Sequence, residues 1–426
     1  MEILIALLIM LVMILLGVPI CFSLGLAAVY ALFTRDISFQ LIPQRMYTSI
    51  DQFALLAIPL YIFVGEAMNT GGVTDRLFGF CRKMLGHVRG SLGHVNVMAS
   101  VIFAGMSGAA VADAAGLGKV ELNAMEDAGF DMDFSAAITA ASSTIGPIIP
   151  PSIPLVLYAV IAEQSVGRLF IGGTVPGLLM AGALCVMVYV ISVKRNYPVD
   201  PKCSGKEKLV SFFRAFPSLL TPAIILFGIF SGVISPTESA AIAAVWSLFL
   251  GFVVHKEMTL KDLYRIAKRT VVSSAAVLMM ISASSILTWL VISSGAPRQF
   301  AAALTAISSN RYVLLLLINI LLLVMGCFLD ATAIITIMVP ILLPIAEMIG
   351  IDLVAFGVIV VLNAMIGLIT PPVGMCLSVT ADIAGLPVSR VVKPMLVFAI
   401  PLVVVLILIT VFPQIVTFLP DLLMGK

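Results

Sequence analysis

The sequence predicts an all-α protein that crosses a membrane many times and consists of two inverted repeats. Of its 426 residues, 61% are hydrophobic and only 11% are charged, whereas soluble domains are about 45–50% apolar and roughly 25% charged. Long apolar stretches recur between Met1 and Phe418, as expected for membrane helices and not for the short alternating strands of a β-barrel. Both halves also contain apolar helices that are interrupted by prolines.

The repeat is marked by three anchors that keep a constant offset of 221 residues (367 − 146). Broken hydrophobic helices at corresponding positions of two halves indicate the binding site of a transporter. The anchors are pairs of identical residues, Gly105 and Gly326, Gly146 and Gly367, and Pro150 and Pro371.

Each half is expected to contain the same elements in the same order. A helix pair comes first, then a short amphipathic segment, an apolar helix, a helical hairpin, a proline-broken helix and a last apolar helix. In the first half the pair is expected at 3–16 and 19–33, the amphipathic segment at 39–50, the apolar helix at 53–68, the hairpin bend at 105–108 and the last helix at 171–193. In the second half the same elements are expected at 218–233 and 236–254, 260–271, 272–292, 326–330 and 395–418.

The start of the sequence can be interpreted in two ways. Residues 1–16 resemble a signal peptide, but they lack a basic start and run through Gly17 and Pro19 into more apolar sequence, so a retained helix is predicted. The second amphipathic segment places Arg265 and Arg269 at near-helical spacing among apolar residues. That pattern predicts a helix lying in the membrane interface, and an ordinary basic loop is the alternative.

Loop charge gives the orientation of both repeats. Four basic residues in the polar connection 71–92 place it in the cytoplasm, and the basic segment 255–269 also belongs there. The polar stretch from Lys194 to Arg214 is the longest hydrophilic one and is predicted to be a cytoplasmic linker. Segment 34–51 is predicted to be outside, so equivalent segments lie on opposite sides and the repeats are inverted.

The broken helices are the expected binding elements. Pro150-Pro151 and Pro371-Pro372 must unwind a helix, and unwound backbone is tolerated at membrane depth only inside protein or beside a cavity. Free carbonyls suit a small cation, and the following half-helix presents its positive end to an anion. Two structural kinks are the alternative, but the constant offset favours a site. Nearby polar side chains are Ser142, Ser143, Thr144 and Ser152, and then Asn363, Thr370 and Ser378.

The hairpin bends carry polar residues amid apolar sequence. Ser107 and Asp113 mark the first bend, and Asp330, Thr332 and Thr336 mark the second. A carboxylate within the membrane is a functional-site hypothesis by default. For Asp330 a helix N-cap is an equal and compatible alternative.

Other acidic residues receive plainer interpretations. Glu238 follows Pro236 and is expected in the first turn of a helix, while Glu66 is expected near the membrane interface. An acidic run is interpreted as a solvated loop between the hairpin and the broken helix. It comprises Glu121, Glu126, Asp127, Asp131 and Asp133.

No constellation of an enzyme is present in the sequence. It has no GxSxG, HExxH or Walker A motif, its six cysteines lack CxxC spacing, and no basic patch for nucleic acid occurs. Transport energy is therefore expected from an ion gradient, and no cofactor is expected.

Three stretches resemble the DctM-like large membrane subunit of tripartite ATP-independent periplasmic (TRAP) transporters. They are Phe103 to Asp113, Gly146 to Ser152 and Gly367 to Gly374, and the resemblance extends over essentially the whole chain. Ala109 departs from the serine expected in many relatives, which weakens any claim for a side-chain ligand there.

The resemblance implies an elevator-like fold of the ion-transporter superfamily in a bacterial inner membrane. It implies uptake of an organic acid, such as a C4-dicarboxylate or a sialic acid, coupled to sodium. The implied partners are a periplasmic binding protein that delivers the substrate and a small four-helix membrane subunit. The implied organisation is a first repeat 1–193 (scaffold 1–52, transport elements 53–193), a linker 194–216, and a second repeat 217–420 (scaffold 217–271, transport elements 272–394, final helix 395–420).

The resemblance also assigns residues. One sodium site would use Ser107, Gly146, Ile149 and Pro151, and another would use Gly326, Gly367, Thr370 and Val373, mostly through backbone carbonyls. The candidate substrate residues come instead from the polar side chains at the breaks and bends, and they are Ser143, Thr144, Ser152, Asp330, Thr332 and Asn363. No arginine is expected at the breaks, since Arg168 and Arg298 are placed in loops.

The prediction is therefore the translocating subunit of a sodium-coupled TRAP transporter. A stand-alone carrier of the same superfamily is the close alternative. A channel and a membrane-embedded enzyme are more distant ones, and the enzyme would need an acid–base pair or metal cluster that the sequence lacks.

Overall fold

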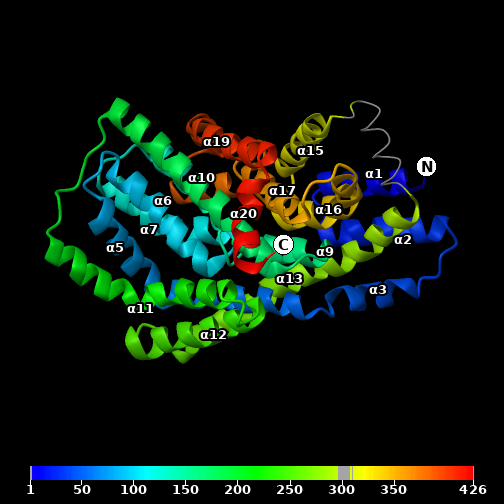
Figure 1. Ribbon diagram of the computed structural model, residues 1–426, viewed down its shortest axis with the longest axis horizontal. Coiled ribbons are helices and arrows are strands. Elements are labelled where there is room, and N and C mark those ends of the chain that lie inside the picture. The colour runs from blue at the N-terminus through cyan, green and yellow to red at the C-terminus, as the bar shows by residue number, and fades with distance from the viewer. Residues whose placement is uncertain (1, 296–307, 309, 426) are drawn as a thin grey trace.

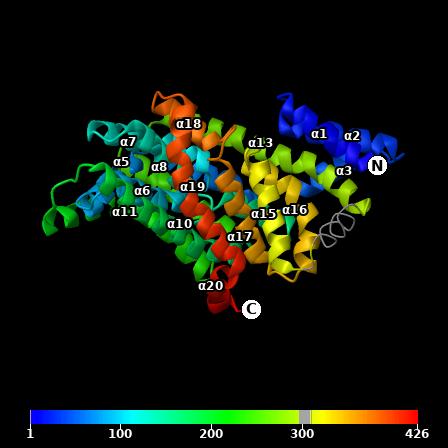
Figure 2. The same cartoon turned by 90° about the horizontal axis from the view of Figure 1, so that it is seen from above.

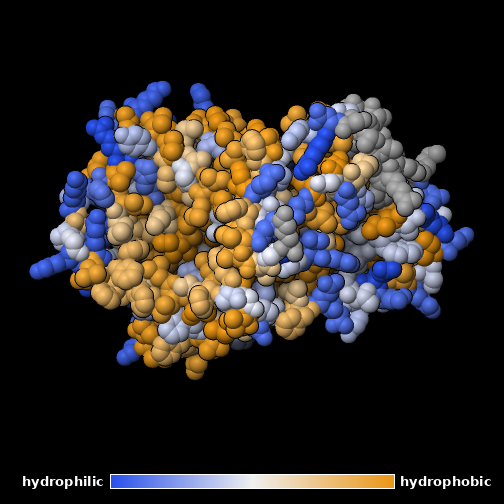
Figure 3. Space-filling model, in the orientation of Figure 1, coloured by the Kyte–Doolittle hydropathy of each residue, from blue (hydrophilic) through white to orange (hydrophobic). Residues whose placement is uncertain are grey.

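The structure is a computed structural model that describes residues 2–295, 308 and 310–425. Over these residues the secondary structure is helical, and seven helices are long and apolar enough to cross a membrane. Apolar side chains cover much of the face seen in Figure 3, and hydrophilic ones are most frequent towards its two ends. Such broad apolar exposure is expected where lipid is the solvent. The predicted all-α polytopic architecture is confirmed.

The molecule is elongated, and different helices form its two ends (Figures 1 and 2). One end holds α1 (Glu2–Leu15), α2 (Ile20–Thr34) and α3 (Leu41–Ile50). The opposite end holds α5 (Val73–Leu85) and α11 (Gly205–Phe230).

The hairpins and broken helices correspond between the halves almost residue by residue. The second hairpin arms α7 (Ala110–Asp127) and α16 (Ala331–Met348) differ by 221 residues at both ends. The other pairs are α6 (Ser91–Ser107) with α15 (Arg311–Gly326), α8 (Met132–Ser143) with α17 (Leu353–Gly367), α9 (Ile153–Ile161) with α18 (Met375–Ile383), and α10 (Val166–Arg195) with α19 (Val388–Val411), after which α20 (Gln414–Met424) ends the described chain.

The remaining helices show where the repeats diverge. In the first half a 3₁₀ turn (Phe53–Leu56) separates α3 from α4 (Ala57–Thr70), whereas α13 (Leu260–Ser293) runs for 34 residues without interruption. The predicted separate segments 260–271 and 272–292 are therefore one helix, because the sequence between them contains no proline or glycine that would stop it. Before α13 lie α12 (Pro236–Phe249) and a π-helical turn (Leu250–Val254).

Three stretches that were expected to be loops are partly helical. The connection 71–92 contains α5, whose apolar Leu77 and Cys81 are buried while Arg82 and Lys83 lie in its last turn. The acidic run is not a solvated loop, because α7 extends to Asp127 and Glu121 is buried. The polar stretch between the repeats is shortened by α10 and α11 to residues 196–204.

The two broken helices lie within the buried core of the molecule. Every residue from Val354 to Gly367 in α17 is buried, as expected for a helix that is hydrophobic on all sides. The Tyr158 hydroxyl of α9 donates a hydrogen bond of 2.6 Å to the Leu353 carbonyl of α17. The ring of Tyr158 also packs against Gly357, so the broken helices of both repeats are in direct contact.

The first prediction concerns the contact between Gly326 and Gly367. A Cβ on Gly326 would lie 2.8 Å from the Gly367 Cα, which is backbone and cannot rotate away. We expect Gly326→Ala to destabilise the protein by about 1–3 kcal/mol, as overpacked cores do. Thermal unfolding of the detergent-purified protein would measure this as a lower Tm.

The matched control is Gly182→Ala in α10, where a Cβ meets nothing within 4 Å. We expect no loss of stability there, because alanine favours the helix over glycine. Equal Tm values for the two variants would contradict the close contact.

Candidate functional site

The two breaks lie between α8 and α9 (residues 144–152) and between α17 and α18 (residues 368–374). Each contains a cis bond, Pro150–Pro151 or Pro371–Pro372. Each is also joined to the neighbouring hairpin bend by a backbone hydrogen bond. The Ile153 N–H donates to the Gly108 carbonyl, and the Val373 N–H donates to the Cys327 carbonyl, both at 3.3 Å. The hairpin bends therefore hold the unwound segments in place.

The structure places two of the four residues predicted for the first sodium site, Ser107 and Gly146, against the same side chain. Gly108 has φ +65° and lies so close to the break that a Cβ there would be 2.7 Å from the Pro151 carbonyl oxygen. The Ser107 hydroxyl donates a hydrogen bond to Asp113. The Asp113 carboxylate lies against Gly146, where a Cβ would collide with it. Ser107 and Gly146 thus contact one carboxylate, whereas Pro151 lies against the hairpin bend at Gly108.

Asp113 was not assigned as an ion ligand from the sequence. Its side chain is 2% exposed, and Oδ2 has no hydrogen-bond partner among the described residues. A buried carboxylate oxygen without a partner is costly, and it is a suitable ligand for a cation. The signal in the sequence is its place six residues after Ser107, in the first turn of the second hairpin arm. Ile149 differs, because its side chain packs on Gly177 of α10 and only its backbone is free to contribute.

The second predicted site has the same backbone arrangement without that carboxylate. Gly326 and Gly367 are in contact, and the Thr370 hydroxyl donates to the Ile366 carbonyl at 2.7 Å. The position equivalent to Asp113 is Ile334, whereas Asp330 is equivalent to Ala109. The two halves therefore carry their bend carboxylates at different positions.

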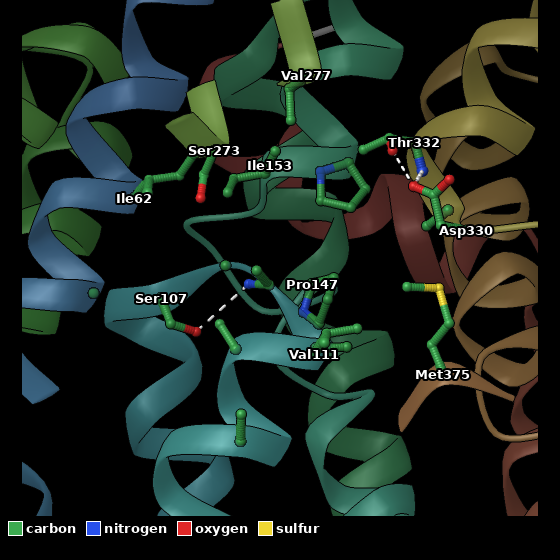
Figure 4. Close-up of a pocket in the computed structure, with 18 of the residues that line it drawn as sticks. Ile62, Ser107, Val111, Pro147, Ile153, Ser273, Val277, Asp330, Thr332 and Met375 are labelled. Atoms are coloured by element: carbon green, nitrogen blue, oxygen red, sulfur yellow. Dashed lines mark hydrogen bonds between the residues drawn. The ribbon is translucent and has the colours of Figure 1, made fainter. Parts of the chain in front are cut away.

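A cavity of about 690 Å³ lies beside both hairpin bends (Figure 4). This volume is within the range of small-molecule sites. In this view Ser107 lies at the lower left, Pro147 near the centre, and Asp330 and Thr332 at the right, while Ser273 and Val277 of α13 lie at the upper left and the top.

Two of the six candidate substrate residues line this cavity, Asp330 and Thr332. The Asp330 carboxylate caps α16 by accepting hydrogen bonds from the Thr332 backbone N–H at 3.1 Å and from the Thr332 hydroxyl. The predicted N-cap is confirmed, and a role in binding remains a prediction. The expected place of Glu238 is also confirmed, since it completes a capping box with Ser235 in the first turn of α12.

The other four candidate substrate residues are buried and bonded to neighbouring groups outside the cavity lining. The Ser143 and Thr144 hydroxyls donate to the carbonyls of Ala140 and Ala141 at 2.8 and 2.6 Å. Ser152 caps α9 by accepting from the Leu155 N–H at 3.1 Å. These contacts satisfy the helix ends beside the break.

Asn363 belongs to a polar contact that recurs in both halves. Its Nδ2 donates to Oδ1 of Asn319 on α15 at 2.8 Å. The equivalent residue 221 positions earlier is Ser142, whose hydroxyl donates to Oδ1 of Asn96 on α6 at 2.6 Å. Asn96 in turn donates to Glu121 at 2.8 Å. In each repeat this contact fixes the broken helix to the first arm of the hairpin.

The cavity also contains an ion pair that sequence reasoning missed. Arg269 of α13 and Glu66 of α4 both line it, and their side chains approach to 3.3 Å. The sequence contains a signal for this pair, because the spacing of Arg269, Ser273 and Met280 places them on one face of a helix, and all three line the cavity. Arg168 lies in the first turn of α10, paired with Asp421 at 2.5 Å, and not in a loop. Arg298 is outside the described residues.

Comparisons with known proteins agree with this architecture. The chain is 45% identical over 420 residues to the sialic acid TRAP transporter permease protein SiaT of Haemophilus influenzae, covering 98% of this chain and 68% of that protein. It is 45% identical over 410 residues to the sialic acid TRAP transporter large permease protein SiaM of Vibrio cholerae, covering 96% of each. It is 37% identical over 401 residues to the C4-dicarboxylate TRAP transporter large permease protein DctM of Pseudomonas aeruginosa, covering 94% of each.

The fold matches that of the YdaH transporter of Alcanivorax borkumensis. The TM-score is 0.67 at 15% sequence identity, covering 87% of this chain and 88% of that one. The family model for the tripartite ATP-independent periplasmic transporter, DctM component, matches residues 7–415. The chain therefore belongs to the DctM family, the large permease components of TRAP transporters, and is a membrane transporter subunit and not an enzyme.

Proposed function

We propose that this chain imports an organic acid together with sodium ions. The observation that carries the proposal is the Asp113 arrangement. Its carboxylate is buried against the Ser107 hydroxyl and Gly146 of the first break, and one carboxylate oxygen has no hydrogen-bond partner in the part of the chain that the structure describes. Carboxylate, hydroxyl and carbonyl oxygens are hard ligands that suit a small cation. The charge of the ion would also offset the cost of burying the carboxylate.

The substrate is proposed to be a carboxylate bound in the cavity between the hairpin bends. Relatives at 45% identity are named as sialic acid permeases, and a relative at 37% is named for C4-dicarboxylates. Sialic acid is therefore the first compound to test. Asp330 and Thr332 line the cavity, so they are proposed to contact the bound molecule or its ion.

The proposed partners are a periplasmic binding protein and a small membrane subunit in a bacterial inner membrane. The names of the relatives support this, because tripartite transporters have three components. The proposed mechanism is elevator-like, with both hairpins and both broken helices moving against the remaining helices. The contacts between each break and its bend support movement as one unit.

The second prediction is sodium-driven uptake. We expect proteoliposomes that hold this chain and the small subunit to accumulate labelled sialic acid only with an inward sodium gradient and the binding protein. Uptake that needs sodium but no binding protein would favour the stand-alone carrier. Uptake driven by a proton gradient alone would overturn the sodium assignment, and uptake that continues without any ion gradient and does not saturate would indicate a channel.

The third prediction concerns Asp113. We expect Asp113→Asn to raise the sodium concentration for half-maximal uptake about tenfold or more, because a charged ligand replaced by a neutral one loses roughly 1.5–3 kcal/mol. Sodium titration of initial uptake rates measures this. Asp127→Asn is the matched control, since Asp127 ends the same helix and is exposed. An unchanged sodium dependence in Asp113→Asn would remove Asp113 from the ion site.

A further inference from the structure

The cavity has an unusual distribution of charge. Its lining includes the carboxylates of Glu66 and Asp330, and Arg269 is its one cationic side chain among the described residues. The carboxylates would repel an anionic substrate, and a positive side chain near the substrate's own carboxylate would offset that repulsion. Among the described side chains of the lining, Arg269 is the one that can supply this charge.

Arg269 is positioned towards the cavity by the periodicity of α13. Arg269, Ser273, Ala276 and Met280 recur at intervals of three or four residues, which places them on one face of the helix. Figure 4 shows Ser273 and Val277 of this helix on either side of Ile153, above Pro147. Arg269 lies one turn before Ser273 on the same face. It is the last residue of the basic segment 255–269, which includes the start of α13.

Most hydrogen-bonding capacity of Arg269 is unused. A guanidinium has five N–H donors in a planar fork that matches a carboxylate, and Arg269 makes a single hydrogen bond, to Glu66 at 3.3 Å, within the described residues. Its side chain is 61% exposed, and that of Glu66 is 30% exposed. An exposed pair with one such bond contributes little to stability. A second carboxylate can therefore replace Glu66 at little cost.

We infer that Arg269 binds the carboxylate of the transported acid and that Glu66 competes with the acid for it. This inference rests on the proposed function and identifies a specificity-determining residue of the same cavity. Glu66 occupies the guanidinium when the cavity is empty, and the substrate carboxylate accepts the paired N–H bonds when it is full. The basic residues of 255–269 favour the cytoplasmic side for this end of the cavity, so the competition by Glu66 promotes release of the acid into the cell.

The test measures binding of N-acetylneuraminic acid and of its C1 methyl ester to the purified complex of this chain with its small subunit, in sodium buffer, by calorimetry. We expect the wild type to prefer the acid. Arg269→Gln should weaken binding of the acid about tenfold or more and leave binding of the ester unchanged, so that the preference disappears. Glu66→Gln should strengthen binding of the acid severalfold, and Arg269→Lys should retain part of the preference.

The matched control is Arg265→Gln. Arg265 lies one turn before Arg269 on α13, is 63% exposed and pairs with Asp262, but does not line the cavity. It should bind both compounds as the wild type does. A wild-type preference retained by Arg269→Gln would overturn this inference and leave the proposed function intact. Failure of the wild type to bind the acid or any other organic acid would overturn the proposed function and this inference together.

Discussion

Two stretches of unwound backbone in the middle of a membrane protein need hydrogen-bond partners, and the rest of this structure depends on how they are supplied. Lipid offers none, so each break must be enclosed by protein. The hairpin bends meet this need through the bonds from Ile153 to Gly108 and from Val373 to Cys327. Such close approach requires glycine at Gly108, Gly326 and Gly367. The same enclosure places the first break against the Asp113 carboxylate and beside the cavity, which together form the candidate site.

The sequence was sufficient for the architecture because its strongest signals are local and repeated. Tandem prolines at a constant offset identified the breaks, and the capping residue Asp330 marked the start of α16. Amphipathic helices were harder to predict. In α5 the buried Leu77 and Cys81 alternate with basic residues, so the sequence of this stretch resembles that of a polar loop. Asn363 and Asp113 show the remaining limit. Whether a polar side chain faces a cavity or a neighbouring helix depends on tertiary contacts, here with Asn319 and Gly146, that no local pattern contains.

The two halves share the same backbone arrangement but carry their carboxylates at different positions. The equivalent residues Ser142 and Asn363 each bond to an asparagine of the first hairpin arm, Asn96 or Asn319, although these two asparagines are not at equivalent positions. Both halves therefore fix the broken helix to the same arm. The carboxylates are not retained, since the residue equivalent to Asp113 in the second half is Ile334, and the residue equivalent to Asp330 in the first half is Ala109. Asp113 is buried beside the first break, whereas Asp330 reaches the cavity. A symmetric scaffold can therefore hold two chemically different sites.

Ser107 connects these sites in the proposed mechanism. Its hydroxyl is bonded to Asp113, and the residue also lines the cavity. An ion held by Asp113 would order the turn from Ser107 to Ala110, which forms part of the wall that the substrate meets. Ion and substrate would then each favour the same arrangement of this turn, and thermodynamic linkage makes the effect reciprocal. The proposed coupling between sodium and an organic acid would therefore need no direct contact between them, because a short, glycine-containing turn would belong to both proposed sites.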